Sequence, residues 1–207
     1  MELSITNNQL SVLHPDYFIG LALLERLYLA GNRLLRVNSE MLGQMPGLVA
    51  LDVSQNELVV FDLEDCTLLN NLQNLTLAHN SIHDISDIIG HCDRLVILDM
   101  SFNQIQVVRG DSLTGRNSAL SRLELEGNPL QCDCRLTGLR DWLFNNPPSA
   151  LPRCQGPARH AGAVVTDLDV HDFSCEPPRA VTSVDHYRVV VGQAVSLSCT
   201  ATGIPTP

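Results

Sequence analysis

The chain has 207 residues and a formal net charge of −10, with 13 basic residues against 23 acidic ones. The basic residues form no cluster, which argues against nucleic acid and against an anionic membrane surface as partners. Hydrophobic residues make up 44% of the chain but aromatic residues only 4%, so the core must be mainly aliphatic. No stretch reaches the ~18 apolar residues of a membrane-spanning helix, and residues 1–4 do not begin a signal peptide.

A repeat runs through the first 130 positions. An asparagine recurs at intervals of 24, 24, 24, 23 and 25 residues in the frame Leu-x-Leu-x-x-Asn-x-Leu, with Val, Met or Ile in place of some leucines. The six asparagines are Asn8, Asn32, Asn56, Asn80, Asn103 and Asn128. Residues 1–130 therefore resemble an array of six leucine-rich repeats.

Each copy predicts one short strand, because its alternating leucines point to one side and into a shared core. Stacked copies predict a leucine-rich-repeat solenoid with a parallel β-sheet on its concave face and an irregular or short helical convex side. The asparagine amide is expected to satisfy backbone groups where the chain leaves the strand. On the return side of the first three repeats, a second apolar set consists of Phe18, Leu42 and Cys66, then Leu21, Met45 and Leu69, then Leu24, Leu48 and Leu72.

Two cysteines fall within the repeats. Cys66 takes the position of Phe18 and Leu42, and Cys92 falls near the position of Met45. Both are expected to be buried, free thiols that behave as small hydrophobic residues. A disulfide between them is the alternative, since they lie in adjacent repeats.

A helix is predicted after the repeats, where Leu136, Leu139, Trp142 and Leu143 follow the spacing of one helix face. The pair Pro147-Pro148 should end it. Residues 131–176 would then form the C-terminal cap that a solenoid needs, because its last repeat would otherwise expose its core.

Four cysteines lie in this cap: Cys132, Cys134, Cys154 and Cys175. Their spacing favours disulfides over a zinc site, because zinc knuckles usually carry Cys-x-x-Cys pairs, but four cysteines alone allow three pairings. The segment closely resembles the cysteine-rich C-terminal flank of extracellular leucine-rich-repeat proteins. That resemblance implies the pairs Cys132–Cys154 and Cys134–Cys175. Disulfides indicate an oxidising compartment, so we expect an internal piece of a longer secreted or membrane-anchored protein.

The composition changes to β-forming residues after Glu176, and the run from Tyr187 ends at Cys199. It resembles the first strands of an immunoglobulin-like domain, with Cys199 as the cysteine of the second strand. An intact domain of this kind has about 100 residues. Residues 177–207 are therefore expected to be the truncated beginning of an all-β immunoglobulin-like domain.

The order of repeats, four-cysteine cap and immunoglobulin-like start resembles the extracellular leucine-rich-repeat/immunoglobulin superfamily. The resemblance implies the ectodomain of a cell-surface recognition or adhesion receptor, extracellular in location, that binds a protein ligand or cell-surface partner. Two alternatives are the non-catalytic front end of a peroxidasin-like extracellular haem peroxidase and a secreted matrix protein. The residues after 207 would discriminate them, by a membrane helix, a peroxidase domain or a stop.

The concave face is the predicted ligand surface, because the residues between the core leucines of each strand point outward there. Its exposed aromatic residues are of the type enriched in binding hot spots, and its acidic residues would attract a basic partner. The candidate ligand-binding residues are Tyr28, Asp52, His79, Asp99, Phe102 and Glu124.

The chain has one Asn-x-Ser/Thr sequon, Asn74-Leu75-Thr76. Leu75 is a predicted core residue, so a glycan on Asn74 would stand on the concave side. No nucleotide-binding loop, nucleophile elbow or metal motif is present in the sequence. We therefore expect no enzymatic activity, no cofactor and no metal.

Overall fold

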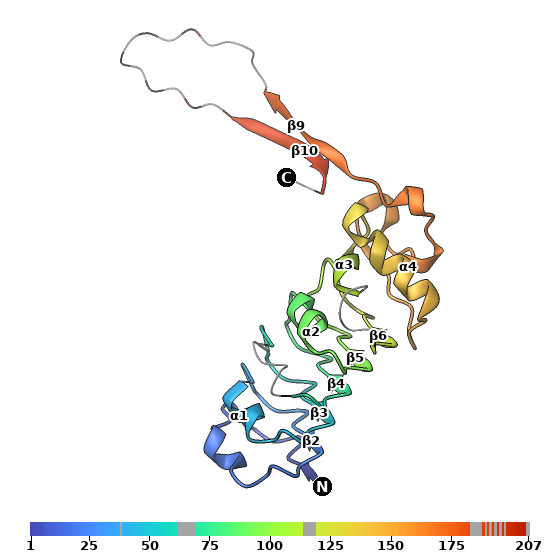
Figure 1. Ribbon diagram of the computed structural model, residues 1–207. Helices are drawn as coiled ribbons and strands as arrows, with labels where there is room; N and C mark the ends of the chain where they lie inside the picture. Colours follow the sequence, from blue (N-terminus) through green and yellow to red (C-terminus); the bar gives the residue numbers. More distant parts are fainter. Residues whose placement is uncertain are drawn as a thin grey trace.

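The computed structural model describes residues 1–37, 39–61, 69–113, 119–182, 188, 190, 192, 194, 196 and 198–205. One six-stranded parallel sheet runs along the molecule in the order β1-β2-β3-β4-β5-β6 (Figure 1). The strands are β1 (Glu2–Ser4), β2 (Arg26–Tyr28), β3 (Ala50–Asp52), β4 (Asn74–Thr76), β5 (Ile97–Asp99) and β6 (Arg122–Glu124). The predicted parallel sheet is confirmed.

Each strand buries its central leucine. The register pairs Leu3 with Leu27, and the series continues through the equivalent leucines of the later strands, Leu51, Leu75, Leu98 and Leu123. From β2 to β6 these side chains are at most 1% exposed, whereas Leu3 in the first strand is half-buried. Each copy of the sequence repeat therefore adds one strand to the sheet, in register with the strand before it.

The repeated asparagines join neighbouring repeats. The Asn80 Nδ2 donates to the carbonyl oxygens of Val53 at 3.1 Å and Leu77 at 2.9 Å. Its Oδ1 accepts from the Leu58 backbone N–H at 2.9 Å. The same three contacts recur at Asn32, Asn56, Asn103 and Asn128. The expected role of the amide is confirmed, and it holds each repeat to the one before it.

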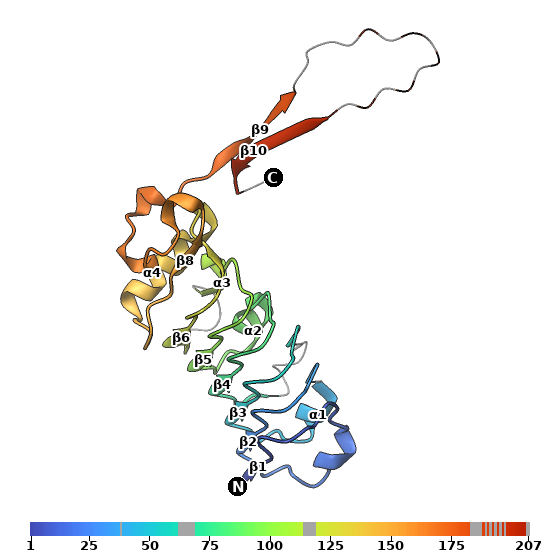
Figure 2. The same ribbon diagram turned by 180° about the vertical axis from the view of Figure 1, so that it is seen from behind.

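Short helices lie across the solenoid from the sheet, as Figures 1 and 2 show. They are the 3₁₀ turn η1 (Pro15–Phe18) and the helices α1 (Ser39–Gly43), α2 (Ser86–His91) and α3 (Gly110–Leu113). Beneath them the expected second apolar set is buried or half-buried at each of its described positions. The prediction of a short helical convex side is therefore confirmed.

Cys92 is buried, as predicted, but it is disulfide-bonded. The expectation of a free thiol at this position is wrong. The spacing of the repeat identified a buried, apolar site, and a disulfide sulfur satisfies that requirement as well as a thiol does. Cys66 lies outside the described residues.

A segment of irregular structure closes the solenoid after β7 (Leu130–Gln131). It contains η3 (Cys134–Leu136), α4 (Thr137–Asn145), β8 (Cys154–Gly156), η4 (Ala158–His160), η5 (Val165–Asp167) and η6 (Val170–Asp172). The predicted helix is α4, which buries Leu139 and Leu143 and ends two residues before Pro147. The disulfides are Cys132–Cys154 and Cys134–Cys175, the pairs that the family resemblance implied.

Two further strands, β9 (Glu176–Thr182) and β10 (Cys199–Ile204), form an antiparallel pair beyond the cap. Cys199 is exposed and has a free thiol. Two paired strands do not identify a β-sandwich, so the immunoglobulin-like assignment of residues 177–207 stays a prediction. Within the described part of the chain, no helix combines the length and apolarity that crossing a bilayer requires.

Candidate functional site

The open face of the sheet carries one central row of side chains. The register aligns Ser4, Tyr28, Asp52, Thr76, Asp99 and Glu124 along it. Tyr28, Asp52 and Asp99 are half-buried within this row. The structure therefore brings four of the six candidate residues into one line, although they are up to 96 residues apart in the sequence (28 to 124).

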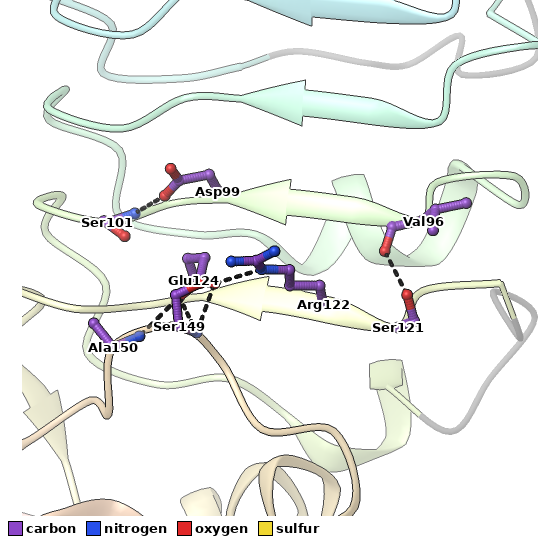
Figure 3. Close-up of polar contacts among 8 residues, drawn as sticks. All are labelled: Val96, Asp99, Ser101, Ser121, Arg122, Glu124, Ser149 and Ala150. Carbon is purple, nitrogen blue, oxygen red and sulfur yellow. Dashed lines mark hydrogen bonds and ion pairs between the residues drawn. The ribbon is translucent and has the colours of Figure 1, made fainter.

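Local hydrogen bonds orient the two aspartates. The Asp52 carboxylate accepts from the backbone N–H of Ser54 at 2.9 Å. Asp99 accepts in the same way from Ser101 at 3.0 Å (Figure 3). Thr76 lies between them in the register, so the two carboxylates are two strand spacings apart, about 9.6 Å. These bonds leave both carboxylates with acceptor capacity for a partner.

Glu124 differs from the rest of its row. It is only 8% exposed, and its carboxylate accepts from the Arg122 Nε at 2.7 Å. It also accepts from the backbone N–H groups of Ser149 at 2.8 and 3.0 Å and of Ala150 at 3.4 Å (Figure 3). Burial raises the pKa of Glu124, but the hydrogen bonds from Arg122 and Ser149 outweigh it and the pKa is lowered.

The expectation that Glu124 is exposed to a ligand is therefore wrong. Strand alternation correctly places its side chain on the open side of the sheet. The cap segment at Ser149 returns over the end of the sheet, however, and covers it. No periodic pattern could reveal that contact, because residues 149 and 150 belong to no repeat.

A second row lies where each strand turns into the following loop, and its backbone is left-handed. Asn7, Gln55, His79 and Phe102 have φ angles of 54–56°, while Gly31 and Gly127 have 70° and 71°. The rings of His79 and Phe102 stack at a centroid distance of 4.4 Å and an angle of 6°. Phe102 is nevertheless 44% exposed. These two candidate residues form one aromatic unit that spans adjacent repeats.

The Phe102 ring also covers the Cα of Gly127, where any Cβ would collide with it. Beyond Gly127, a pocket of about 580 Å³ lies between the last two repeats and the cap. The repeat side contributes Phe102, Glu126 and Pro129, and the cap side contributes Leu151 and Arg153. Leu151 and Arg153 were not predicted as site residues, because nothing in the aperiodic cap sequence indicates that they face the repeats.

The sequon lies on the open face, at the start of β4. Asn74 is exposed, Leu75 is fully buried and Thr76 is half-buried beside Asp52 and Asp99 in the register. A glycan on Asn74 would therefore start next to the central row.

One group of three potential metal ligands occurs among the described residues, at Asp133, Cys134 and Cys175. Its two sulfur atoms form a disulfide with each other, so they are not available as thiolate ligands. Asp133 is bound by the Arg135 guanidinium, with 2.6 Å between Oδ2 and Nη2. This cluster is therefore a structural part of the cap.

A family model described as leucine rich repeat matches residues 1–58 and 70–130. Leucine-rich repeat and fibronectin type III domain-containing protein 1 of Danio rerio is 33% identical over 171 residues, which covers 76% of this chain and 28% of that protein. Vasorin of Homo sapiens is 30% identical over 205 residues, which covers 95% of this chain and 30% of that protein. The chain thus spans less than a third of the length of these relatives.

Two solved structures share the fold. A chain of the mouse RP105/MD-1 complex is 24% identical with a TM-score of 0.70, covering 81% of this chain and 29% of that chain. A chain of the octameric complex of Latrophilin 3, Unc5D and FLRT2 (LRR) is 26% identical with a TM-score of 0.71, covering 83% of this chain and 53% of that chain.

Proposed function

The chain belongs to the leucine-rich repeat family, and from that premise we propose that it is part of an extracellular recognition receptor. It binds a protein ligand through the concave face of its sheet and catalyses no reaction. The observation that carries the proposal is the pair of rows on this face: Tyr28, Asp52 and Asp99 lie in the central row, and the stacked pair His79 and Phe102 lies in the second row.

The disulfides of the cap support the extracellular location. Two disulfides join Cys132 to Cys154 and Cys134 to Cys175. Disulfides of this kind persist in secreted and cell-surface proteins and are rare in the cytosol. They support an extracellular position for the whole solenoid, because cap and repeats share one core.

A protein partner fits the chemistry of the concave face. Aromatic side chains with two rotatable bonds supply contact area at low entropic cost, and carboxylates fixed in place favour a basic partner surface. The structure of similar fold with Latrophilin 3, Unc5D and FLRT2 is an octameric complex of several proteins. That assembly supports a protein ligand here, although it consists of different proteins.

Residues 1–130 serve in this proposal as the recognition module and residues 131–176 as its cap. Residues 177–207 begin an immunoglobulin-like domain. The antiparallel pairing of β9 with β10 supports that assignment, because the sheets of such domains are antiparallel.

Glycosylation of Asn74 would restrict where a ligand can lie. A glycan there would crowd Thr76 and the aspartates beside it, at the centre of the sheet. An occupied sequon would obstruct the centre of the concave face and shift the ligand to a lateral edge, the convex side or the immunoglobulin-like segment. Mass spectrometry of secreted protein, with Asn74→Gln as the reference, measures the occupancy.

The test of the proposed function uses the secreted chain, clustered on streptavidin, against an array of extracellular protein domains. Tyr28→Ala should weaken binding of its ligand by about tenfold or more, as expected for an aromatic hot spot. Tyr17→Ala is the matched control, since Tyr17 is 73% exposed in η1 on the opposite side. Equal affinities for both variants would overturn the concave-face proposal.

A further inference from the structure

The pocket between the last repeat and the cap is formed by residues that are far apart in the sequence. Phe102 lies in the fifth repeat and Glu126 in the sixth, whereas Leu151 and Arg153 follow α4 in the cap. At about 580 Å³ the pocket is of a size that admits one large side chain and the backbone on either side of it.

Covalent and polar contacts hold the walls of this pocket in place. The Cys132–Cys154 disulfide fixes the residue next to Arg153. Glu124 binds the backbone of Ser149 and Ala150 immediately before Leu151. On the repeat side, His79 supports the ring of Phe102. A pocket whose walls are fixed before binding loses little conformational entropy when it is filled.

The apolar surface of the pocket comes from both walls. Phe102 is 44% exposed and Leu151 is 49% exposed. The stacked ring of His79 and the Cα of Gly127 occupy the surroundings of Phe102. The exposed part of the ring is therefore better suited to contact with an apolar side chain than with a cation. A cation would need a free aromatic face.

The polar groups of the pocket define what should flank that apolar side chain. Glu126 is exposed, and within the described part of the chain its carboxylate has neither an ion-pair partner nor a hydrogen-bond partner. Arg153 donates one hydrogen bond from Nη1 to the carbonyl oxygen of Gly162 at 2.8 Å, which leaves other N–H groups of its guanidinium open. A cation beside Glu126 would pair with its carboxylate, and a backbone carbonyl beside Arg153 would accept a hydrogen bond from its guanidinium.

We propose that this junction pocket binds an exposed segment of the protein partner in which a basic residue is adjacent to a leucine or aromatic residue. The apolar side chain lies between Phe102 and Leu151, the basic one pairs with Glu126, and a backbone carbonyl accepts from Arg153. This proposal rests on the proposed function and names the part of the site that selects the ligand.

The test titrates the isotopically labelled full chain with the capped peptide acetyl-Gly-Arg-Leu-Gly-amide and follows backbone amide shifts by NMR. Saturable shifts should appear at Gly127, Leu151 and Gly162. The peptides with Glu in place of Arg, or with Gly in place of Leu, should bind at least about threefold more weakly, because each lacks one of the two matched groups. Equal binding of all three peptides, or an absence of saturable shifts at these residues, would overturn the proposal.

Variants then assign the effect to the pocket. Glu126→Gln should weaken peptide binding about threefold, and Leu151→Ala about fivefold. Glu57→Gln and Val60→Ala are matched exposed changes outside the pocket and should leave it unchanged. Equal effects of Glu126→Gln and Glu57→Gln would contradict the proposed ion pair.

The two proposals fail in different ways. If the array ligand is lost on Tyr28→Ala but is unaffected by Glu126→Gln and Leu151→Ala, the concave-face function stands and the pocket proposal is wrong. If the ligand is unaffected by Tyr28→Ala and Tyr17→Ala alike while the peptide shifts remain, the pocket binds its segment and the wider concave-face proposal is wrong.

Discussion

The repeats and the cap are stabilised by different kinds of contact. In the repeats the same three asparagine hydrogen bonds recur from one copy to the next, at nearly constant sequence offsets. In the cap each important contact occurs once: two disulfides, the Glu124 carboxylate on Ser149, and the close approach of Gly110 in α3 to Gly138 in α4.

The two kinds of contact explain why a solenoid tolerates substitutions in its repeats better than in its cap. The stability of a solenoid is approximately a sum over its repeats and the interfaces between neighbouring repeats. Each repeat therefore contributes one of several similar terms to the free energy of unfolding. A cap has no second copy of any contact, and the loss of one affects the whole unit. The comparison predicts which substitutions have large effects and where in the molecule those effects appear.

The largest effect is expected from removing a cap disulfide. Cys134→Ala with Cys175→Ala opens a cross-link over 41 residues, which should lower the free energy of unfolding by about 4 kcal/mol in the chain-entropy model. Denaturant unfolding measures the loss, and hydrogen exchange should place it in α4 and β8 while β2 to β4 stay protected. Cys199→Ala, at an exposed free thiol, is the control and should change nothing measurable. Uniform loss of protection along the solenoid would contradict the division into two regions.

The disulfide at Cys92 allows the same kind of test in the repeats. Cys92 is disulfide-bonded, and non-reducing peptide mapping tests the pairing with Cys66 that the repeat spacing left as the alternative. Cys92→Ala should then lower the free energy of unfolding by about 3 kcal/mol. A change below about 1 kcal/mol would mean that the hydrogen bonds and core of the repeats make this cross-link redundant.

Asparagine substitutions measure how much the hydrogen bonds between neighbouring repeats contribute to the free energy of unfolding. Asn80→Ala leaves the buried Leu58 N–H without its acceptor, and the carbonyl groups of Val53 and Leu77 each lose one of two asparagine donors. The change should cost about 2 to 3 kcal/mol. Asn8→Ala is the matched control, because Asn8 is exposed and, among the described residues, its amide donates only to the Thr6 carbonyl oxygen. It should cost less than about 0.5 kcal/mol. Similar losses at both positions would show that the amide acts within one repeat and does not connect two.

The smallest expected effect comes from Glu124. Glu124→Gln replaces an ionised acceptor that faces three N–H donors and should cost about 1 to 2 kcal/mol near neutral pH. The pKa of Glu124 is lowered in the folded protein, so its contribution is complete above the ordinary glutamate pKa of about 4.3 and is lost as the pH falls through the lower, folded value.

The difference in stability between wild type and Glu124→Gln should therefore shrink with acidification below about pH 4.3. Glu126→Gln, two residues further along the chain at an exposed carboxylate, is the matched control and should cause no such loss of stability. A pH-independent difference for Glu124→Gln would assign its effect to packing.

Most of the repeat region was predictable from the sequence. The alternation of core leucines gave the strands and their register, because side chains two residues apart must point to the same face of a strand. The left-handed backbone of the second row was not recognised, since Asn7, Gln55, His79 and Phe102 have nothing in common beyond their position in the frame. The stacking of His79 on Phe102 follows from that shared backbone conformation.

The solenoid, the open face and the cap helix follow from the amino-acid sequence, because these depend on periodic burial, which a single strand or helix already displays. The folded chain was needed to show that Glu124 is covered, that Cys92 is bonded, and that Leu151 and Arg153 complete a pocket with Phe102 and Glu126. Each of these outcomes depends on where a non-repeating segment or a side-chain partner is placed. Such contacts occur once and between residues distant in the chain, so no local or periodic signal encodes them.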